Sequence, residues 1–211
     1  MISSTRAERR NMEINAEKIG KNLFIKLMNK KSVPKDAMNA KILDLAFTYN
    51  VVAEDEIIVI SGKMMNEISE ESGITVQRFH EIAMANTVRL MPPVFAPLQS
   101  FLDPPQKSSN SSLFVITNRQ KTLGAATIFY PGMMEKIAEM VGSSYFVLPS
   151  SVHELIIVPD TGDYDYRFLE KTVSTINSDP VRISPDEKLS DNVYYFDRKA
   201  KAFDFARNFA K

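Results

Sequence analysis

Four residues in the stretch PSSVHE have side chains that could carry hydrolytic chemistry. Ser150, Ser151, His153 and Glu154 lie within five positions of one another. A serine hydroxyl becomes a nucleophile when a histidine takes its proton and a third group orients that histidine. With Asp191 as the candidate carboxylate from elsewhere in the chain, the sequence allows a hydrolase centred on these serines and His153.

The same stretch also fits a turn between two buried strands. In an extended chain Ser151 and His153 share one face about 6.5 Å apart, whereas Glu154 points to the opposite face and cannot orient the imidazole. No G-x-S-x-G elbow surrounds either serine. The spacing Ser151-x-x-Glu154 fits a capping-box turn, in which each side chain binds a backbone N–H of the other. We therefore interpret PSSVHE as a turn and keep catalysis as the alternative.

Three acidic residues in VPDTGDYDYR suggest a divalent-metal site. Asp160, Asp163 and Asp165 offer the oxygen ligands that Ca²⁺ and Mg²⁺ prefer. Their spacing does not match the EF-hand loop, and a glycine turn followed by a helix N-cap at Asp165 predicts the same acids. The loop TNRQKTLGAA also lacks the glycine pattern of phosphate-binding loops. We expect no metal and no cofactor, with the three aspartates as the metal candidates to examine.

Composition excludes several classes of site. The 211 residues include no cysteine, so disulfides, thiolate metal sites, Fe–S clusters and a cysteine nucleophile are excluded. No apolar run approaches the roughly 20 residues that cross a bilayer, and the N-terminus lacks the apolar centre of a secretory signal. We expect a cytoplasmic protein without a membrane partner.

Positive charge is concentrated at the N-terminal end, although the whole chain has 26 basic and 26 acidic residues. Residues 1–41 contain ten basic and four acidic side chains, a net charge of about +6. Between Ala16 and Lys30, apolar residues recur at helical spacing, which predicts a basic amphipathic helix. We expect this helix to pack its apolar stripe on the core, and a nucleic-acid contact through residues 16–31 is the weaker alternative.

The rest of the chain alternates between β-rich runs and amphipathic helices. We expect strands over residues 42–52, 56–60, 113–117, 125–130, 145–148 and 155–158, helices after Ser61, Thr75, Pro131 and Asp165, and a final hairpin in NVYYFDRKAKAFDFA. Strand pairs joined by short turns are antiparallel, so the fold class is α+β. The polar stretch DPPQKSSNSS predicts a linker at residues 103–112, between an N-terminal α+β region, residues 1–102, and a C-terminal α+β domain, residues 113–211.

Three segments of the C-terminal half are distinctive together: FVITNRQKTLGAATIFYPGMMEKIAEMVGS, YFVLPSSVHELIIVPD and SPDEKLSDNVYYFDR, with ANTVRLMPP upstream. With these segments the chain resembles a bacterial family of unknown function, number 5688. The resemblance is dense from Ser111 to Arg198 and fades over residues 1–41. It implies a fold and an order of elements but no activity. The residues that match its pattern are Thr117, Asn118, Gly124, Pro149, Ser150, Ser151, His153, Glu154, Ser190 and Asp191.

Catalytic side chains are scarce in this chain, which has two histidines and no cysteine. This scarcity favours a non-enzymatic binding or regulatory protein, of bacterial or mobile-element origin, whose partner is another protein. A hydrolase that uses Ser150 or Ser151 with His153 is the alternative. Nothing in the residues decides the oligomeric state.

Overall fold

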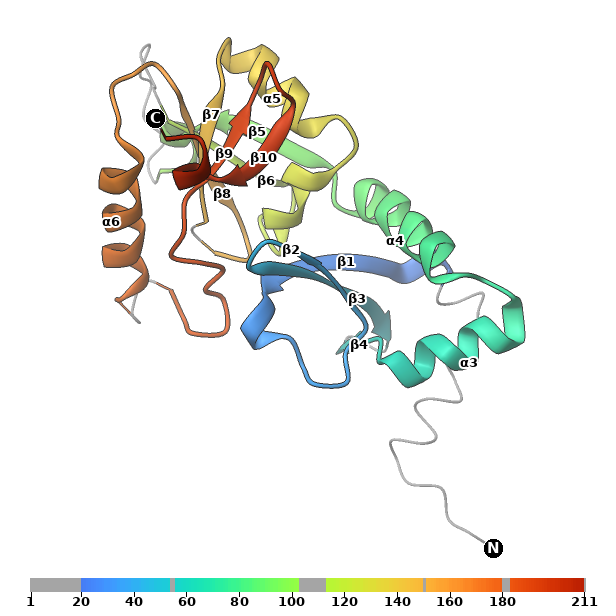
Figure 1. Cartoon of the computed structure of the whole chain (residues 1–211). Helices are drawn as coiled ribbons and strands as arrows, with labels where there is room; N and C mark the ends of the chain where they lie inside the picture. Colours follow the sequence, from blue (N-terminus) through green and yellow to red (C-terminus); the bar gives the residue numbers. More distant parts are fainter. Residues whose placement is uncertain (1–19, 54–55, 103–112, 150, 180–182, 211) are drawn as a thin grey trace, which may run out of the picture.

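The structure is a computed structural model that describes residues 20–53, 56–102, 113–149, 151–179 and 183–210. Two antiparallel sheets form its frame (Figure 1). In the first sheet, β3 pairs with each of the other three strands; the strands are β1 Leu23–Asn29, β2 Asn39–Ile42, β3 Leu45–Ala53 and β4 Glu56–Val59. The second sheet has the order β10-β9-β7-β8-β6-β5 and consists of β5 Pro93–Pro97, β6 Phe114–Asn118, β7 Tyr145–Leu148, β8 Leu155–Pro159, β9 Tyr194–Asp197 and β10 Ala202–Phe205. The predicted α+β class is confirmed.

Three of the α-helices begin after the predicted capping residues. The α-helices are α3 Gly62–Ser72, α4 Val76–Leu90, α5 Met133–Val141 and α6 Tyr166–Asn177, and the 3₁₀ helices are η1 Lys30–Ser32, η2 Leu98–Phe101, η3 Gly124–Phe129 and η4 Ala206–Asn208. The side chains of Ser61, Thr75 and Asp165 accept backbone N–H groups in the first turns of α3, α4 and α6. Gly142, in the left-handed region at φ 80°, ends α5 as predicted. Within the described ranges, no helix has the length and apolar character needed to cross a membrane.

The predicted basic helix is wrong over Leu23–Asn29, which form strand β1. The run LFIKLM has an apolar spacing that fits a helix and equally a strand buried on both faces. The hydrogen-bond partners of this segment determine that it is a strand. One edge of β1 pairs with β3, and on the other edge the N–H of Ile25 donates to Oγ1 of Thr87 in α4 over 2.9 Å. This strand contains one lysine, Lys26, so Leu23–Asn29 do not present a helical face of lysines. A nucleic-acid contact through residues 16–31 stays a prediction. Residues 16–19 lie outside the described part of the chain.

The predicted strand at residues 125–130 is also wrong, because Gly124–Phe129 form the 3₁₀ helix η3. Its first five residues are all buried. Leu123, at φ 56°, turns the chain into this helix from the end of β6. Small side chains at 124–126 allow the helix to lie against β6 and β1, so a segment with strand-like composition becomes a buried connection between the sheets.

Strand β5 lies upstream of the predicted linker yet belongs to the second sheet, where it pairs with β6. The linker itself, residues 103–112, lies outside the described ranges, and the proposed division into domains stays a prediction. The two sheets also share apolar packing. One cluster of buried residues includes Leu23 and Tyr49 from the first sheet and Ile116, Ile157 and Tyr194 from the second.

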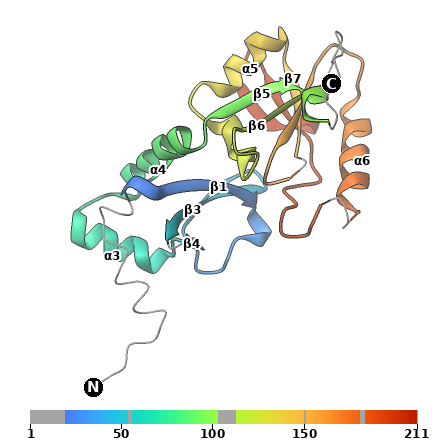
Figure 2. The ribbon, with the colours of Figure 1, turned by 180° about the vertical axis from the view of Figure 1, so that it is seen from behind.

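A second, smaller apolar cluster lies between α6 and the second sheet. It includes Phe146 of β7, Val158 of β8, and Leu169 and Val173 of α6. Both views place α6 along one side of the second sheet, away from α3 and α4 (Figure 2). The N-terminal end of α6 and the loop before it therefore lie beside the sheet face that carries Phe146.

Candidate functional site

The PSSVHE turn connects β7 to β8, and Ser151 and Glu154 close it. The Ser151 N–H donates to the Glu154 carbonyl over 3.3 Å, and the Ser151 hydroxyl donates to Oε1 of Glu154 over 3.0 Å. The same hydroxyl oxygen accepts the N–H of His153 over 3.1 Å. The closure thus uses a side-chain pair and a short serine turn in place of the reciprocal backbone bonds of a capping box. Ser150 lies outside the described residues.

Both ring nitrogens of His153 have partners within the protein. Nδ1 accepts the backbone N–H of Leu123 over 3.2 Å, and Nε2 lies 3.1 Å from Oε1 of Glu187. A backbone N–H can only donate, so Nδ1 is the acceptor and Nε2 carries the proton that it donates to Glu187. This hydrogen bond from His153, with a second from Ser184, holds the pKa of the Glu187 carboxyl below its usual range. The imidazole therefore has no lone pair available for the Ser151 hydroxyl.

The residues beneath this turn are bound to one another. The hydroxyl of Thr117 donates to the His153 carbonyl over 2.7 Å. Asn118 closes the following loop, because its side-chain amide donates to the Thr122 carbonyl and accepts the Thr122 N–H. A Cβ added to Gly124 would lie 2.3 Å from Oγ1 of Thr117 and 2.6 Å from the His153 carbonyl oxygen. These signature residues form a packed junction between the loop after β6 and the β7–β8 turn.

Asp191, the candidate third member of a triad, binds other residues. Its carboxylate accepts the side-chain amide of Asn177 over 3.1 Å and forms an ion pair with Lys188 over 2.8 Å. Glu187, not Asp191, is the carboxylate on His153. The structure therefore does not assemble the predicted Ser–His–Asp arrangement among its described residues.

Asp44 forms a second junction, which sequence reasoning missed. It lies in the turn between β2 and β3 and accepts hydrogen bonds from the hydroxyl of Ser190 over 2.5 Å, the amide of Asn192 over 2.9 Å and the hydroxyl of Tyr194 over 2.7 Å. Asn29 adds a bond from its side-chain amide to the Leu189 carbonyl. The LSDNVY segment thus binds the first sheet to the second.

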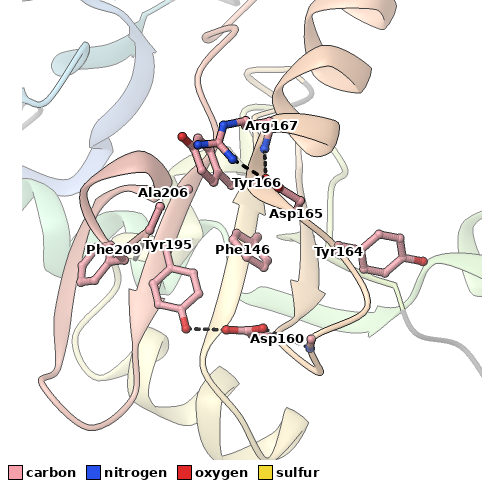
Figure 3. A pocket seen from close by; sticks show the side chains of 11 residues that line it. Phe146, Asp160, Tyr164, Asp165, Tyr166, Arg167, Tyr195, Ala206 and Phe209 are labelled. Atoms are coloured by element: carbon pink, nitrogen blue, oxygen red, sulfur yellow. Dashed lines mark hydrogen bonds and ion pairs between the residues drawn. The ribbon is translucent and has the colours of Figure 1, made fainter.

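Two of the three metal candidates line a pocket of about 330 Å³ at the N-terminal end of α6 (Figure 3). Its walls come from β7, the loop after β8, the start of α6, β9 and the C-terminal end: Phe146, Asp160, Gly162, Tyr164, Asp165, Tyr166, Arg167, Tyr195, Ala206, Phe209 and Ala210. Asp163 does not line it and accepts the Thr161 hydroxyl instead. No group of three His, Asp or Glu residues in the described ranges is arranged to hold a metal ion.

Aromatic rings lie beside the carboxylate of Asp160 in this pocket. The ring of Tyr195 lies 5.0 Å from the ring of Phe146 and 5.0 Å from that of Phe209. Its hydroxyl donates to Oδ2 of Asp160 over 2.6 Å. Burial, with the hydrogen bond to Asp160, raises the pKa of Tyr195 to about 12. In Figure 3 Asp160 and Arg167 lie at opposite ends of the pocket, with Phe146 between them.

A second cavity, of about 360 Å³, lies beside the PSSVHE turn. Its lining combines apolar and polar residues of η2, β6, β8 and the adjoining loops: Leu98, Phe101, Val115, Thr117, Lys121, Glu154 and Ile156. The ammonium group of Lys121 lies 5.3 Å from the centre of the Phe101 ring. Thr117 and Glu154 are signature residues that line this cavity, and both also hold the turn.

A family model described as "Family of unknown function (DUF5688)" matches residues 2–198. The chain belongs to this family. The DUF5688 match covers both junctions and most of the aromatic pocket, and it ends before Ala206, Phe209 and Ala210. No curated protein and no solved structure matches the chain.

Sequence reasoning placed the turn, the Asp165 cap and strands such as β4, β7 and β8, but it missed β1, Glu187 and the aromatic pocket. Asp160 was a candidate for a different reason, as a metal ligand. The signal that could have found the pocket is the recurrence of aromatic residues near the aspartates, in DTGDYDYR and in NVYYFDR.

Proposed function

We propose that this DUF5688 protein is a non-enzymatic binding protein of the cytoplasm, of bacterial or mobile-element origin, whose partner is another protein. The observation that supports it is the state of His153, whose two ring nitrogens are occupied by Leu123 and Glu187. A general base needs a free lone pair within reach of the proton it abstracts. The alternative, a hydrolase that uses Ser150 or Ser151 with His153, lacks that lone pair.

The aromatic pocket is the proposed binding site. Pockets for small ligands have volumes of about 300–1,000 Å³ and combine apolar walls with a few polar groups. At about 330 Å³, this pocket matches the lower end of that range and suits one side chain of a partner or a small molecule. Tyrosine and phenylalanine supply large contact area at low entropic cost, which makes Tyr195 and Phe209 natural anchors.

The binding function is tested by screening the ¹⁵N-labelled protein by NMR against a fragment library of cationic, neutral and anionic aromatic compounds. We expect hits that shift the amide signals of residues 160–167 and 194–196. Phe209→Ala should weaken these hits about tenfold, because it removes one wall of the pocket. Met140→Ala, at an exposed position of α5 that is not part of the pocket, is the matched control and should leave them unchanged.

Turnover is tested in parallel with an activated ester such as p-nitrophenyl acetate. We expect the wild-type protein and Ser151→Ala to hydrolyse it at the same background rate. Hydrolysis that is lost in Ser151→Ala would contradict the proposal, as would a screen whose hits leave the pocket signals unmoved.

A further inference from the structure

The charges at the two ends of the aromatic pocket are balanced differently. At one end the Arg167 guanidinium lies 3.4 Å from the Asp165 carboxylate and 5.0 Å from the centre of the Tyr166 ring. At the other end Asp160 accepts hydrogen bonds from two neutral donors, the Tyr195 hydroxyl over 2.6 Å and the Gly162 N–H over 3.3 Å. No lysine, arginine or histidine among the described residues forms an ion pair with Asp160. Among the described residues of the pocket lining, the carboxylate of Asp160 is therefore the charge without an ionic partner.

Aromatic residues line the same pocket as this charge. Phe146, Tyr195 and Phe209 form a continuous group, with successive ring centres 5.0 Å apart, and Tyr164 lies on the opposite side of the pocket in Figure 3. The face of an aromatic ring carries partial negative charge and attracts a cation placed within about 6 Å. Aromatic rings and a carboxylate that line the same small pocket both favour a positively charged ligand.

An anionic ligand is disfavoured by the same residues. The pocket includes the first turn of α6, and helix N-termini attract anions. Here that position is already taken, because the Asp165 carboxylate accepts the Arg167 N–H over 2.8 Å. An added anion would lie near both Asp165 and Asp160, and the only arginine of the lining is already paired with Asp165.

We infer that the aromatic pocket binds an organic cation, with an ammonium group against Asp160 and its alkyl substituents against the rings of Phe146, Tyr195 and Phe209. This inference rests on the proposed binding function and names the chemical class of its ligand. A carboxylate offers about four acceptor positions, and Asp160 uses two of them within the protein, so acceptor capacity remains for a ligand. The cation can come from a lysine side chain of a partner protein, with or without methylation, or from a free quaternary amine.

The test compares choline with its neutral isostere, 3,3-dimethyl-1-butanol, by NMR titration of the full chain. The two probes have the same shape and differ in charge. We expect choline to bind at least tenfold more tightly, with shifts at residues 160–167 and 194–196. Asp160→Asn should remove this preference, and Asp163→Asn, in the same loop but outside the pocket lining, should preserve it.

A second arm identifies the source of the cation. Short peptides that contain lysine or trimethyllysine are titrated beside choline, and tighter binding of a peptide assigns the cation to a protein partner. Phe209→Leu, which replaces a ring by an alkyl group, should reduce the choline preference about fivefold, and it provides a test if Asp160→Asn fails to fold.

Equal affinity for choline and its isostere, or an unchanged preference in Asp160→Asn, would overturn the inference. So would the absence of pocket shifts with choline and both peptides. If neutral or anionic fragments still bind the pocket in those cases, the binding function stands and only the ligand class is wrong. If no fragment of any charge binds, the proposed function fails with it.

Discussion

The Nε2 atom of His153 lies 3.1 Å from Oε1 of Glu187, which belongs to a segment 34 positions further along the chain. On the other side of the ring, the Leu123 N–H occupies Nδ1. The imidazole thus connects three segments, the loop after β6, the β7–β8 turn and the approach to β9. This structural role explains the presence of a histidine in PSSVHE, and no catalytic role is needed to explain it.

Removing this ring should lower stability. In His153→Ala the Leu123 N–H loses its acceptor, and a buried donor without a partner costs about 1–3 kcal/mol of the free energy of unfolding. Urea denaturation followed by circular dichroism measures the change. Asp186→Ala, at the exposed position beside Glu187, is the control and should stay within about 0.5 kcal/mol of wild type. A loss in His153→Ala no larger than in the control would contradict the junction.

Gly124 should tolerate no side chain. A Cβ there would lie 2.3 Å from Oγ1 of Thr117 and 2.7 Å from the Asn118 nitrogen, and one of these contacts is with the backbone, which cannot rotate away. We expect Gly124→Ala to cost about 3 kcal/mol or more, measured by the same denaturation experiment. Gly62→Ala is the matched control, because its nearest neighbour lies at 4.0 Å and alanine is favoured in a helix. Equal stability of the two variants would show that the junction at Gly124 is looser than described.

Asp44 should hold the LSDNVY segment on the first sheet. Asp44→Ala removes the acceptor of three hydrogen bonds, from Ser190, Asn192 and Tyr194, and we expect a loss of about 2–4 kcal/mol. A double-mutant cycle of Asp44→Asn with Tyr194→Phe isolates one of these bonds. Additive effects in that cycle would mean that the Tyr194 hydroxyl contributes nothing through Asp44.

Tyr195 should make stability fall at alkaline pH. Its pKa is about 12 in the folded protein and about 10 in an unfolded chain. Because the folded value is raised, the contribution of this hydroxyl is complete below about pH 10 and is lost as the pH rises toward about 12. The stability difference between wild type and Tyr195→Phe should shrink over that window, as measured by urea denaturation at a series of pH values. Tyr164→Phe, another residue of the pocket, is the control, and an equal alkaline change in both variants would contradict the assignment to the Tyr195–Asp160 bond.

Local features of the fold could be predicted because their causes are local. Ser61, Thr75 and Asp165 cap helices through bonds to residues two or three positions away, and the turn at Gly142 requires a left-handed residue. The structures of residues 23–29 and 124–129 could not be predicted, because the sequences LFIKLM and GAATIF fit more than one local structure. Packing against α4 and β6 decides them, and that packing is not visible in either segment.

The functional features depend on partners that are distant in the sequence. Asp44 binds residues 146 to 150 positions away, and Tyr195 reaches Asp160 across 35 positions. No local pattern marks such pairs. The spacing within PSSVHE predicted a turn, but the role of Glu187 required knowledge of which loop covers His153.

The central claim, that His153 is a structural residue and not a base, is tested most directly by its tautomer. The chain has two histidines, so a long-range ¹H–¹⁵N spectrum of His80→Gln reports on His153 alone. We predict a ring protonated at Nε2, with Nδ1 as the hydrogen-bond acceptor of the Leu123 N–H and no change in Ser151→Ala. A ring protonated at Nδ1, with Nε2 free and sensitive to Ser151→Ala, would contradict it and return PSSVHE to the candidates for an active site.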